Sequence, residues 1–259
     1  MKDFLGRWMP IDASAHGPAL DEMNALVHWL MALLFIGWGI YFIWVLFRYR
    51  ARRNPQASYE GVKSHVSTWV EVGVVVFEAV LLIGFAIPAW ARWVEPPSPE
   101  DNPLVVRVIG EQFAWNVHYA GVDGVFGSQK PELITPSNPI GLDPNDPTGS
   151  DDIVSINQLH LPVDRPVTVL LSSKDVIHSF ALPVMRVKQD AIPGMEIPVH
   201  FTPVVSTPPE AVFPACAAGK TCWEIACAQL CGLGHYRMRG FLTVHEAGGF
   251  EAWLASKAG

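Results

Sequence analysis

Two long apolar stretches close to the N-terminus constrain the fold of this chain more than any other feature. Residues 25–47 contain no Asp, Glu, Lys or Arg, and residues 72–90 are interrupted only by Glu78. About 20 apolar residues in a helix cross the hydrocarbon core of a bilayer, where a helix satisfies its own backbone hydrogen bonds. The second stretch far exceeds a strand of about 5–6 residues, and Trp69 and Trp90 flank it like interfacial anchors. The sequence therefore predicts two transmembrane helices.

The segment between these two stretches is strongly basic. It contains Arg48, Arg50, Arg52, Arg53 and Lys63, and the positive-inside rule places such a short loop in the cytoplasm. Topology explains these charges better than nucleic-acid binding does. We therefore expect a two-pass protein of the bacterial inner (cytoplasmic) membrane, with the lipid membrane as a partner, no nucleic acid, and both termini on the periplasmic side.

The net negative charge of the chain lies in the part after the second apolar stretch. From residue 95 onward the acidic residues exceed the basic ones by eight, whereas the first 94 residues carry a net charge of +1. One interpretation is simple solubility. The other is an electrostatic docking surface for a cationic partner, and charge alone favours neither.

This exported part has the pattern of an all-β domain. A proline-rich linker at residues 95–103 cannot continue a helix. Short β-like runs then occupy residues 104–110, 167–173, 196–202 and 240–246. Runs of this kind with Gly and Pro turns predict a β-sandwich or a small barrel. Residues 135–152 are rich in Pro, Asn, Asp and Gly and are interpreted as a long surface loop, and helical periodicity returns only around residues 250–255.

The most chemically informative motif gathers Cys227, Cys231, His235 and Met238 within twelve residues. A disulfide would explain the cysteines but not the histidine and the methionine. Zinc favours Cys/His sets, but zinc-finger cysteine pairs usually have shorter spacing and methionine is a poor zinc ligand. Soft thiolates and a thioether favour copper. A second thiolate four residues after the first would allow both sulfurs to bridge two coppers.

Each copper then needs an imidazole. His235 supplies one, and His178, which follows the apolar run at residues 167–171, is the preferred candidate for the other. The remaining candidates are expected to lie at the surface or to support the site indirectly; they are His118, His160, His200 and His245.

These motifs resemble subunit II of the heme–copper cytochrome c oxidases. The resemblance rests on C-x-x-x-C-x-x-x-H-x-x-M, from Cys227 to Met238, on SKDVIHSF, which contains His178, and on VKQDAIPG at residues 187–194. It implies two N-terminal transmembrane helices followed by an all-β cupredoxin-like exported domain, a Greek-key β-barrel. The implied division is residues 1–94 for the anchor and residues 95–259 for the periplasmic domain.

The resemblance also implies a function, namely electron relay. Cys227 and Cys231 would bridge two coppers of a binuclear centre called CuA. His178 and Met238 would complete one metal, and His235 with the backbone carbonyl of Gln229 the other. Electrons would come from a periplasmic cytochrome c or a similar carrier, with Asp175 as a docking carboxylate. They would pass to heme in subunit I for O₂ reduction coupled to proton pumping.

The sequence departs from the family pattern at three places. One is an insertion-like segment with Cys216 and Cys222, for which free thiols or an accessory metal role are the alternatives to a disulfide. Gln229 replaces the usual glutamate, which puts an interface Mg²⁺ or Mn²⁺ in doubt because a neutral amide is a weaker ligand for a hard cation. Phe113 replaces the first tryptophan of the family's Q-W-x-W run, so electrons would enter through Trp115 or by another route, unless both rings only pack against the site.

Two acidic residues and two cysteines are further candidates for a role. Glu71 and Glu78 are candidates for a proton path, because a carboxylate within a membrane span is costly and by default functional. Cys216 and Cys222 are expected to form a local disulfide.

Two alternative functions remain open at the level of sequence. One is a CuA subunit of a nitric oxide reductase. The other is a membrane-anchored copper chaperone or redox sensor, which would bind a labile mononuclear copper. The chain contains no C-x-x-C-H motif for a covalently attached heme, so the electron donor is expected to be a separate molecule.

Overall fold

The computed structural model describes residues 9–56, 59–61, 64–214, 216 and 222–257. Lys63 of the basic loop lies outside these residues. The chain divides into two compact units, one containing Asp21–Glu95 and the other containing Pro96–Gly259 together with the segment that ends at Leu20.

The first unit is built from two long apolar helical stretches. Helix α2 spans Gly17–Arg48, and the second stretch comprises α3 (Val66–Leu81), the π-helical turn η1 (Leu82–Ala86) and α4 (Ile87–Val94). The candidate membrane spans have mean hydropathies of 2.3 and 2.4, and no residue of their most apolar windows is buried inside the protein. The expectation of two N-terminal apolar helices is confirmed, and the surrounding lipid would cover these exposed side chains.

The π-helical turn in the second stretch has a local cause. The amide of Ile87 donates to the carbonyl of Leu82, five residues earlier, and the next residue is Pro88, which has no amide hydrogen and clashes with a regular α-helical turn before it. Widening the helix by one residue accommodates the proline without ending the helix.

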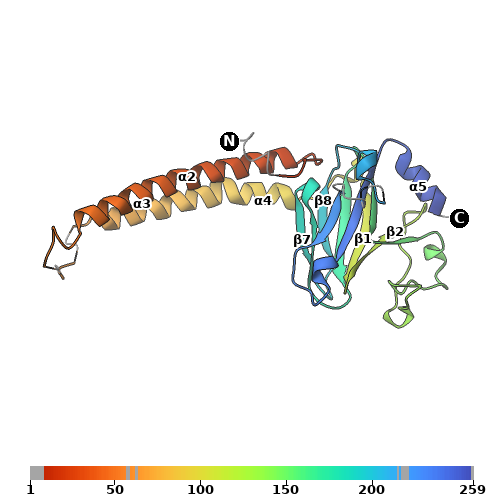
Figure 1. The fold of residues 1–259 in the computed structure, drawn as a ribbon. Helices are drawn as coiled ribbons and strands as arrows, with labels where there is room; N and C mark the ends of the chain where they lie inside the picture. Colours follow the sequence, from red (N-terminus) through yellow and green to blue (C-terminus); the bar gives the residue numbers. More distant parts are fainter. Residues whose placement is uncertain (1–8, 57–58, 62–63, 215, 217–221, 258–259) are drawn as a thin grey trace. The chain divides into compact units, whose positions relative to one another are not determined.

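The second unit is a sandwich of two five-stranded sheets (Figure 1). The first sheet has the strand order β3-β2-β1-β5-β8 and the second has the order β4-β10-β9-β6-β7. Strand pairing is parallel between β1 and β5 and between β4 and β10, and antiparallel at every other pairing given for these strands. The strand bounds are β1 Leu104–Glu111, β2 Ala114–Tyr119, β3 Ile153–Ile156, β4 Gln158–Pro162, β5 Val167–Ser173, β6 His178–Leu182, β7 Val187–Ala191, β8 Ile197–Phe201, β9 Glu224–Cys227 and β10 Arg239–His245.

Alternation of apolar and polar residues explains why the sandwich forms. In β5, the side chains of Val167, Val169 and Leu171 are fully buried while the residues between them are only partly covered. Trp115, Phe180 and Leu242 contribute from other strands to the same buried cluster. The two apolar faces can leave water only by packing against each other. Helix α5 (Gly249–Lys257) follows the last strand.

The loop expected at residues 135–152 is indeed without regular strands, but it is packed rather than free. Ile140 is buried, and the loop covers the outer face of the first sheet. There His118 of β2 meets the Asp152 carboxylate at 2.6 Å, with both side chains fully buried. The Arg107 guanidinium lies 4.3 Å from the centre of the Phe126 ring.

A short N-terminal segment belongs to the β unit and not to the anchor. Residues 9–20 group with the sandwich, whereas the division expected from the sequence places them with the anchor. Ala13 is fully buried, its amide donates to the carbonyl of Val184, and its carbonyl accepts from the amide of Val204. These bonds make residues 13–15 an added edge of the sandwich.

Candidate metal centre

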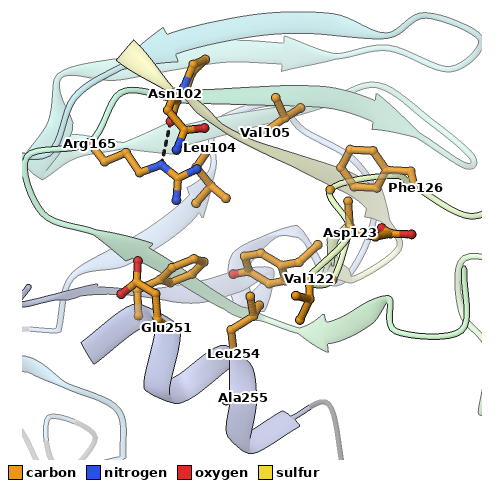
Figure 2. A pocket seen from close by; sticks show the side chains of 16 residues that line it. Asn102, Leu104, Val105, Val122, Asp123, Phe126, Arg165, Glu251, Leu254 and Ala255 are labelled. Atoms are coloured by element: carbon orange, nitrogen blue, oxygen red, sulfur yellow. Dashed lines mark hydrogen bonds between the residues drawn. The ribbon is translucent and has the colours of Figure 1, made fainter. Parts of the chain in front are cut away.

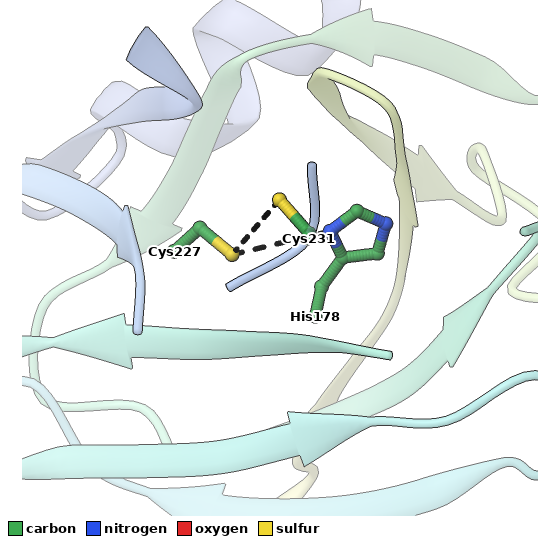
Figure 3. Close-up of side chains that lie close together, drawn as sticks. All are labelled: His178, Cys227 and Cys231. Atoms are coloured by element: carbon green, nitrogen blue, oxygen red, sulfur yellow. Dashed lines mark hydrogen bonds between the residues drawn. The ribbon is translucent and has the colours of Figure 1, made fainter. Parts of the chain in front are cut away.

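Two cysteines and two histidines form a row at the end of strands β6, β9 and β10. The His178 Nδ1 to Cys227 Sγ distance is 3.9 Å, the two Sγ atoms are 3.8 Å apart, and Cys231 Sγ lies 3.6 Å from His235 Nδ1. Figure 3 shows the first three of these side chains pointing toward one another. The Met238 Sδ atom is 3.7 Å from Cys231 Sγ, and the Gln229 carbonyl oxygen is 3.2 Å from Cys227 Sγ.

These spacings fit ligands that share metal ions. Two ligand atoms bound to one tetrahedral ion at about 2.0–2.3 Å lie about 3.3–3.8 Å from each other. A disulfide would bring the two sulfurs to about 2.05 Å, and both Cys227 and Cys231 are free thiols. His178 Nδ1 and both sulfurs lie within 4.8 Å of one another. The donor set of two thiolates, two imidazoles and a thioether suits a soft metal such as copper.

The turn between β5 and β6 fixes the orientation of His178. Its ring is fully buried, and Nε2 lies 2.8 Å from Asp175 Oδ1. With the proton on Nε2, the ring donates to Asp175 and presents the lone pair of Nδ1 to the sulfurs. A Cβ atom at position 110 would lie 2.9 Å from His178 Cδ2. Gly110 therefore allows the β1 backbone to approach the ring.

Asp175 is stabilised as a carboxylate. Burial alone would raise the pKa of this carboxyl group, but hydrogen bonds from His178 and from the amides of Gln112 and Val176 outweigh it and hold the pKa below its ordinary value. An ionised acceptor makes a stronger hydrogen bond to the imidazole than a neutral one does.

The loop that carries the other ligands is folded tightly by two glycines. Strand β9 ends at Cys227, the 3₁₀ turn η8 spans His235–Arg237, and β10 begins directly after Met238. Gly232 has a φ of 129°, which side chains rarely tolerate. A Cβ atom at Gly234 would collide with the ring of Phe113. The loop therefore lies directly on the turn between β1 and β2.

The buried thiol of Cys231 holds its proton tightly in the metal-free protein. Cys231 is 3% exposed. Burial, followed by the hydrogen bond and charge of Cys227, raises the pKa of the Cys231 thiol to about 11. A metal must therefore displace a proton when it binds this sulfur.

A family model described as "Cytochrome C oxidase subunit II, periplasmic domain" matches residues 104–243, which include all six candidate ligands. The chain belongs to the cytochrome c oxidase subunit II family. The fold class expected from the sequence, two apolar helices before a cupredoxin-like β domain, is therefore confirmed.

Curated relatives agree with this membership over nearly the full chain. The "Alternative cytochrome c oxidase subunit 2" of Bradyrhizobium diazoefficiens is 32% identical over 95% of this chain and 82% of its own length. The "Heme-copper oxidase subunit 2" of Aeropyrum pernix is 25% identical over 84% of each chain. A crystal structure of the periplasmic domain of subunit II of cytochrome oxidase from Bradyrhizobium japonicum is 25% identical, covers 60% of this chain and 92% of its own, and gives a TM-score of 0.39.

The two aromatic residues proposed for electron uptake lie at different depths in this subunit II. Trp115 is fully buried, and its ring centre is 6.0 Å from that of His178 and 5.6 Å from that of Phe180. Phe113 is only partly buried and covers the ligand loop at Gly234. Both rings therefore pack on the candidate centre, Trp115 from inside the domain and Phe113 from nearer its surface.

The two glutamates belong to the helical unit, and the other candidate histidines of the β unit do not join the row of ligands. Glu71 and Glu78 are exposed on α3, two helical turns apart and therefore on one face. His118 is bonded to Asp152, His160 Nδ1 lies 2.9 Å from His245 Nε2, and His200 Nδ1 lies 3.0 Å from Thr168 Oγ1. The expected Cys216–Cys222 disulfide is present.

One contributor was not singled out by the sequence reasoning. Gln112 donates a hydrogen bond from its side-chain Nε2 to the carbonyl of Cys231, at 2.6 Å. The signal in the sequence is the first position of the Q-W-x-W run, whose aromatic residues alone suggest a part in electron uptake.

A cavity of about 540 Å³ lies at the opposite end of β1 and β2 from the candidate centre, beside α5 (Figure 2). Arg165 lies on one side of it and Glu251 on the other, with Leu104 and Leu254 among its apolar walls. The described residues that line this cavity include no cysteine or histidine, so it offers no second soft-metal site.

Proposed function

We propose that this subunit II holds a binuclear copper centre and relays single electrons from a periplasmic carrier to a heme-bearing subunit I. The observation that carries the proposal is the row of nitrogen, sulfur, sulfur and nitrogen atoms spaced by 3.6–3.9 Å. When bound, the two coppers would supply a one-electron couple that both bridging thiolates share. The role of the protein is to hold the ligands in place before and after each transfer.

His178 and the cysteine loop each have supports that serve this role. Asp175 orients His178, Trp115 packs against the same ring, and two glycines allow the cysteine loop to lie against Phe113. Because the surrounding structure is already packed, the ligands have little freedom to move when the charge on the centre changes. Small movement means low reorganisation energy, which favours fast electron transfer.

We propose that His178 and Met238 complete one copper and that His235 and the carbonyl of Gln229 complete the other. Each sulfur would contact both metals. A short distance between a sulfur and a terminal ligand therefore does not decide which copper that ligand binds. The neutral side chain of Gln229 is exposed and makes a second, hard-cation site at an interface with subunit I unfavourable.

The loop that bears the ligands offers an apolar surface for a partner. Leu230, Leu233 and Tyr236 are 81%, 98% and 85% exposed. Exposed apolar side chains of this size commonly lie in protein interfaces. We propose that this surface meets a redox partner of the oxidase, and that Phe113 and Trp115 are the rings closest to the electron's path into the centre.

The proposed orientation follows from the charges and the disulfide. The basic loop between the helices would be cytoplasmic, and the β domain would face the periplasm, where disulfides such as Cys216–Cys222 persist. Glu71 and Glu78, which share a face of α3, are proposed to line a proton path into subunit I.

A measurement on the purified oxidase assembly tests this function. Reduced cytochrome c is mixed with the assembly, and the rate of heme reduction is compared with and without copper in this subunit. We expect rapid heme reduction only in the copper-loaded assembly, with O₂ consumed at steady state. Equal rates without copper would contradict the relay, and turnover of nitric oxide without O₂ consumption would favour the nitric oxide reductase alternative.

A further inference from the structure

Two residues outside the ligand set connect the two ligand-bearing loops. Strand β6 begins at His178, directly after its turn, and the loop after β9 carries Cys231, 53 positions later in the chain. The amide of Gln112 donates to Asp175 Oδ2 at 2.7 Å, and its side chain donates to the carbonyl of Cys231 at 2.6 Å. Asp175 in turn holds His178 Nε2 through its other oxygen.

We propose that Gln112 and Asp175 act together as a clamp that sets the position of His178 relative to the cysteine loop. The proposal rests on the copper function given above and deepens it. Gln112 and Asp175 would touch neither copper nor the electron donor. They are positioning residues, and their effect would reach the metals through the His178 ring and the Cys231 backbone.

The carboxylate of Asp175 is arranged for this task. Its Oδ1 atom accepts from the amide of Val176 at 2.7 Å and from His178, and its Oδ2 atom accepts from the amide of Gln112. Its side chain is 31% exposed. Both oxygens therefore have internal partners, whereas a docking carboxylate would turn at least one oxygen toward the cationic partner.

The turn that carries Asp175 is also braced from its other side. The Lys174 ammonium group pairs with Glu111 and donates to the carbonyl of Pro139 at 2.6 Å. Glu111 is the last residue of β1 and immediately precedes Gln112. The loop over the first sheet, the β1–β2 turn and the His178 turn are thus joined by consecutive polar contacts.

The clamp has consequences that a docking site would not have. Without the carboxylate, the His178 ring loses the acceptor that fixes its tautomer and its rotation. Changes to groups that orient a metal ligand typically cost about 10–100-fold in metal affinity. Without the side chain of Gln112, the cysteine loop loses a hydrogen bond at the Cys231 carbonyl.

The test compares copper-loaded full chains in detergent, with no electron donor present. The variants are Asp175→Ala, Asp175→Asn and Gln112→Ala, with Glu224→Gln as the matched control, because Glu224 is a partly exposed acid on β9 that pairs with Arg239 and not with a ligand. Copper affinity is measured by competition with a copper(I) chelator, and the EPR hyperfine splitting and the reduction potential are recorded on the same samples.

We expect Asp175→Ala to lower copper affinity about 10–100-fold and to change the hyperfine splitting. Gln112→Ala should change the affinity and the splitting in the same direction. Asp175→Asn should retain most of the affinity, because the amide keeps an acceptor oxygen, while raising the reduction potential through the lost charge. Glu224→Gln should resemble the wild type. If Asp175→Ala fails to fold, the reduction potential of Asp175→Asn, compared with that of Glu224→Gln, still tests the clamp.

If all variants keep the wild-type affinity, spectrum and potential, then Gln112 and Asp175 do not position the ligands, and the clamp is overturned. A separate mixing experiment with added cytochrome c then shows what Asp175 does instead. Slower, salt-dependent reduction of Asp175→Asn would make Asp175 the docking residue that the resemblance implied. A wild-type chain that binds no copper pair would instead overturn the proposed function, and the clamp with it.

Discussion

Two pairs of histidines lie near opposite ends of strand β10, and their surroundings differ. At its beginning, His178 and His235 point ring nitrogens at the sulfurs of Cys227 and Cys231. At its far end, the ring nitrogens of His160 and His245 lie 2.9 Å from each other. Two sulfurs that could bridge metals lie between the histidines of the first pair. In the second pair, a ring nitrogen of one histidine contacts a ring nitrogen of the other.

The aromatic neighbours sharpen this contrast. His160 stacks on Trp253, with ring centres 4.1 Å apart and planes 15° from parallel. Burial, followed by the charge of His245, lowers the pKa of His160 to about 3. The far pair is thus a neutral, packed element that holds α5 against the sheet. The role of a histidine in this protein therefore depends on which atoms face its ring nitrogens. The number of histidines nearby matters less.

The largest expected effect comes from removing a bridging sulfur. In Cys227→Ser, the hard hydroxyl replaces a soft thiolate, so we expect complete loss of the delocalised copper signal. Copper content and EPR spectra of the full chain in detergent measure this. The double variant Cys216→Ser/Cys222→Ser is the matched control, because it removes two sulfurs outside the row and should keep the signal. A Cys227→Ser protein with an unchanged spectrum would show that the two sulfurs do not bridge the coppers.

The next effect separates the two histidine pairs directly. We expect His178→Ala to weaken copper binding by more than about 100-fold, because it removes a ligand and not only its support. His160→Ala should leave copper affinity unchanged and lower the stability of the β domain. Chelator competition and urea unfolding measure the two quantities. Equal losses of copper affinity in both variants would contradict the distinction.

The far pair should also make stability depend on pH. The folded pKa of His160 lies below that of the unfolded chain, so its contribution is present above about pH 6.5 and is lost as the pH falls toward about 3. The expected slope is about 1.4 kcal/mol per pH unit for one such group. Urea unfolding at pH 7 and pH 4.5 measures it, and His160→Gln should flatten the dependence. An unchanged slope in this variant would assign the pH dependence to other groups.

The smallest expected effect is that of the disulfide. Cys216 and Cys222 are six positions apart, and closing so short a loop stabilises a fold by about 2 kcal/mol through the entropy of the unfolded chain. The double serine variant should lose about this amount in urea unfolding, with no change at the copper centre. A loss of copper from this variant would show that the disulfide supports the centre after all.

Regular patterns explain which strands could be predicted from the sequence. The alternation in residues 167–173 corresponds to β5, and the runs at residues 104–110, 196–202 and 240–246 correspond to β1, β8 and β10 with shifts of one residue or so. Strand β2 was missed because Asn116 and His118 look like surface residues but are buried. The loop that ends at Asp152 covers them, and no local pattern shows such a cover.

The candidate centre was predictable where its residues are close in sequence. The spacing from Cys227 to Met238 gathers four donors within one loop, and His178 was the preferred second imidazole because it follows the apolar run at residues 167–171. The contacts of Gln112 with Cys231 and Asp175 could not be predicted from spacing in the sequence. It exists only because the β1–β2 turn, the β5–β6 turn and the cysteine loop meet in space.

The central claim is that the row of His178, Cys227, Cys231 and His235 holds two coppers that share one electron. Metal analysis and EPR of the copper-loaded full chain in detergent, before any partner is added, test it most directly. We expect two coppers per chain and one unpaired electron delocalised over both. A single copper with a localised spectrum, or bound zinc with no copper signal, would contradict it.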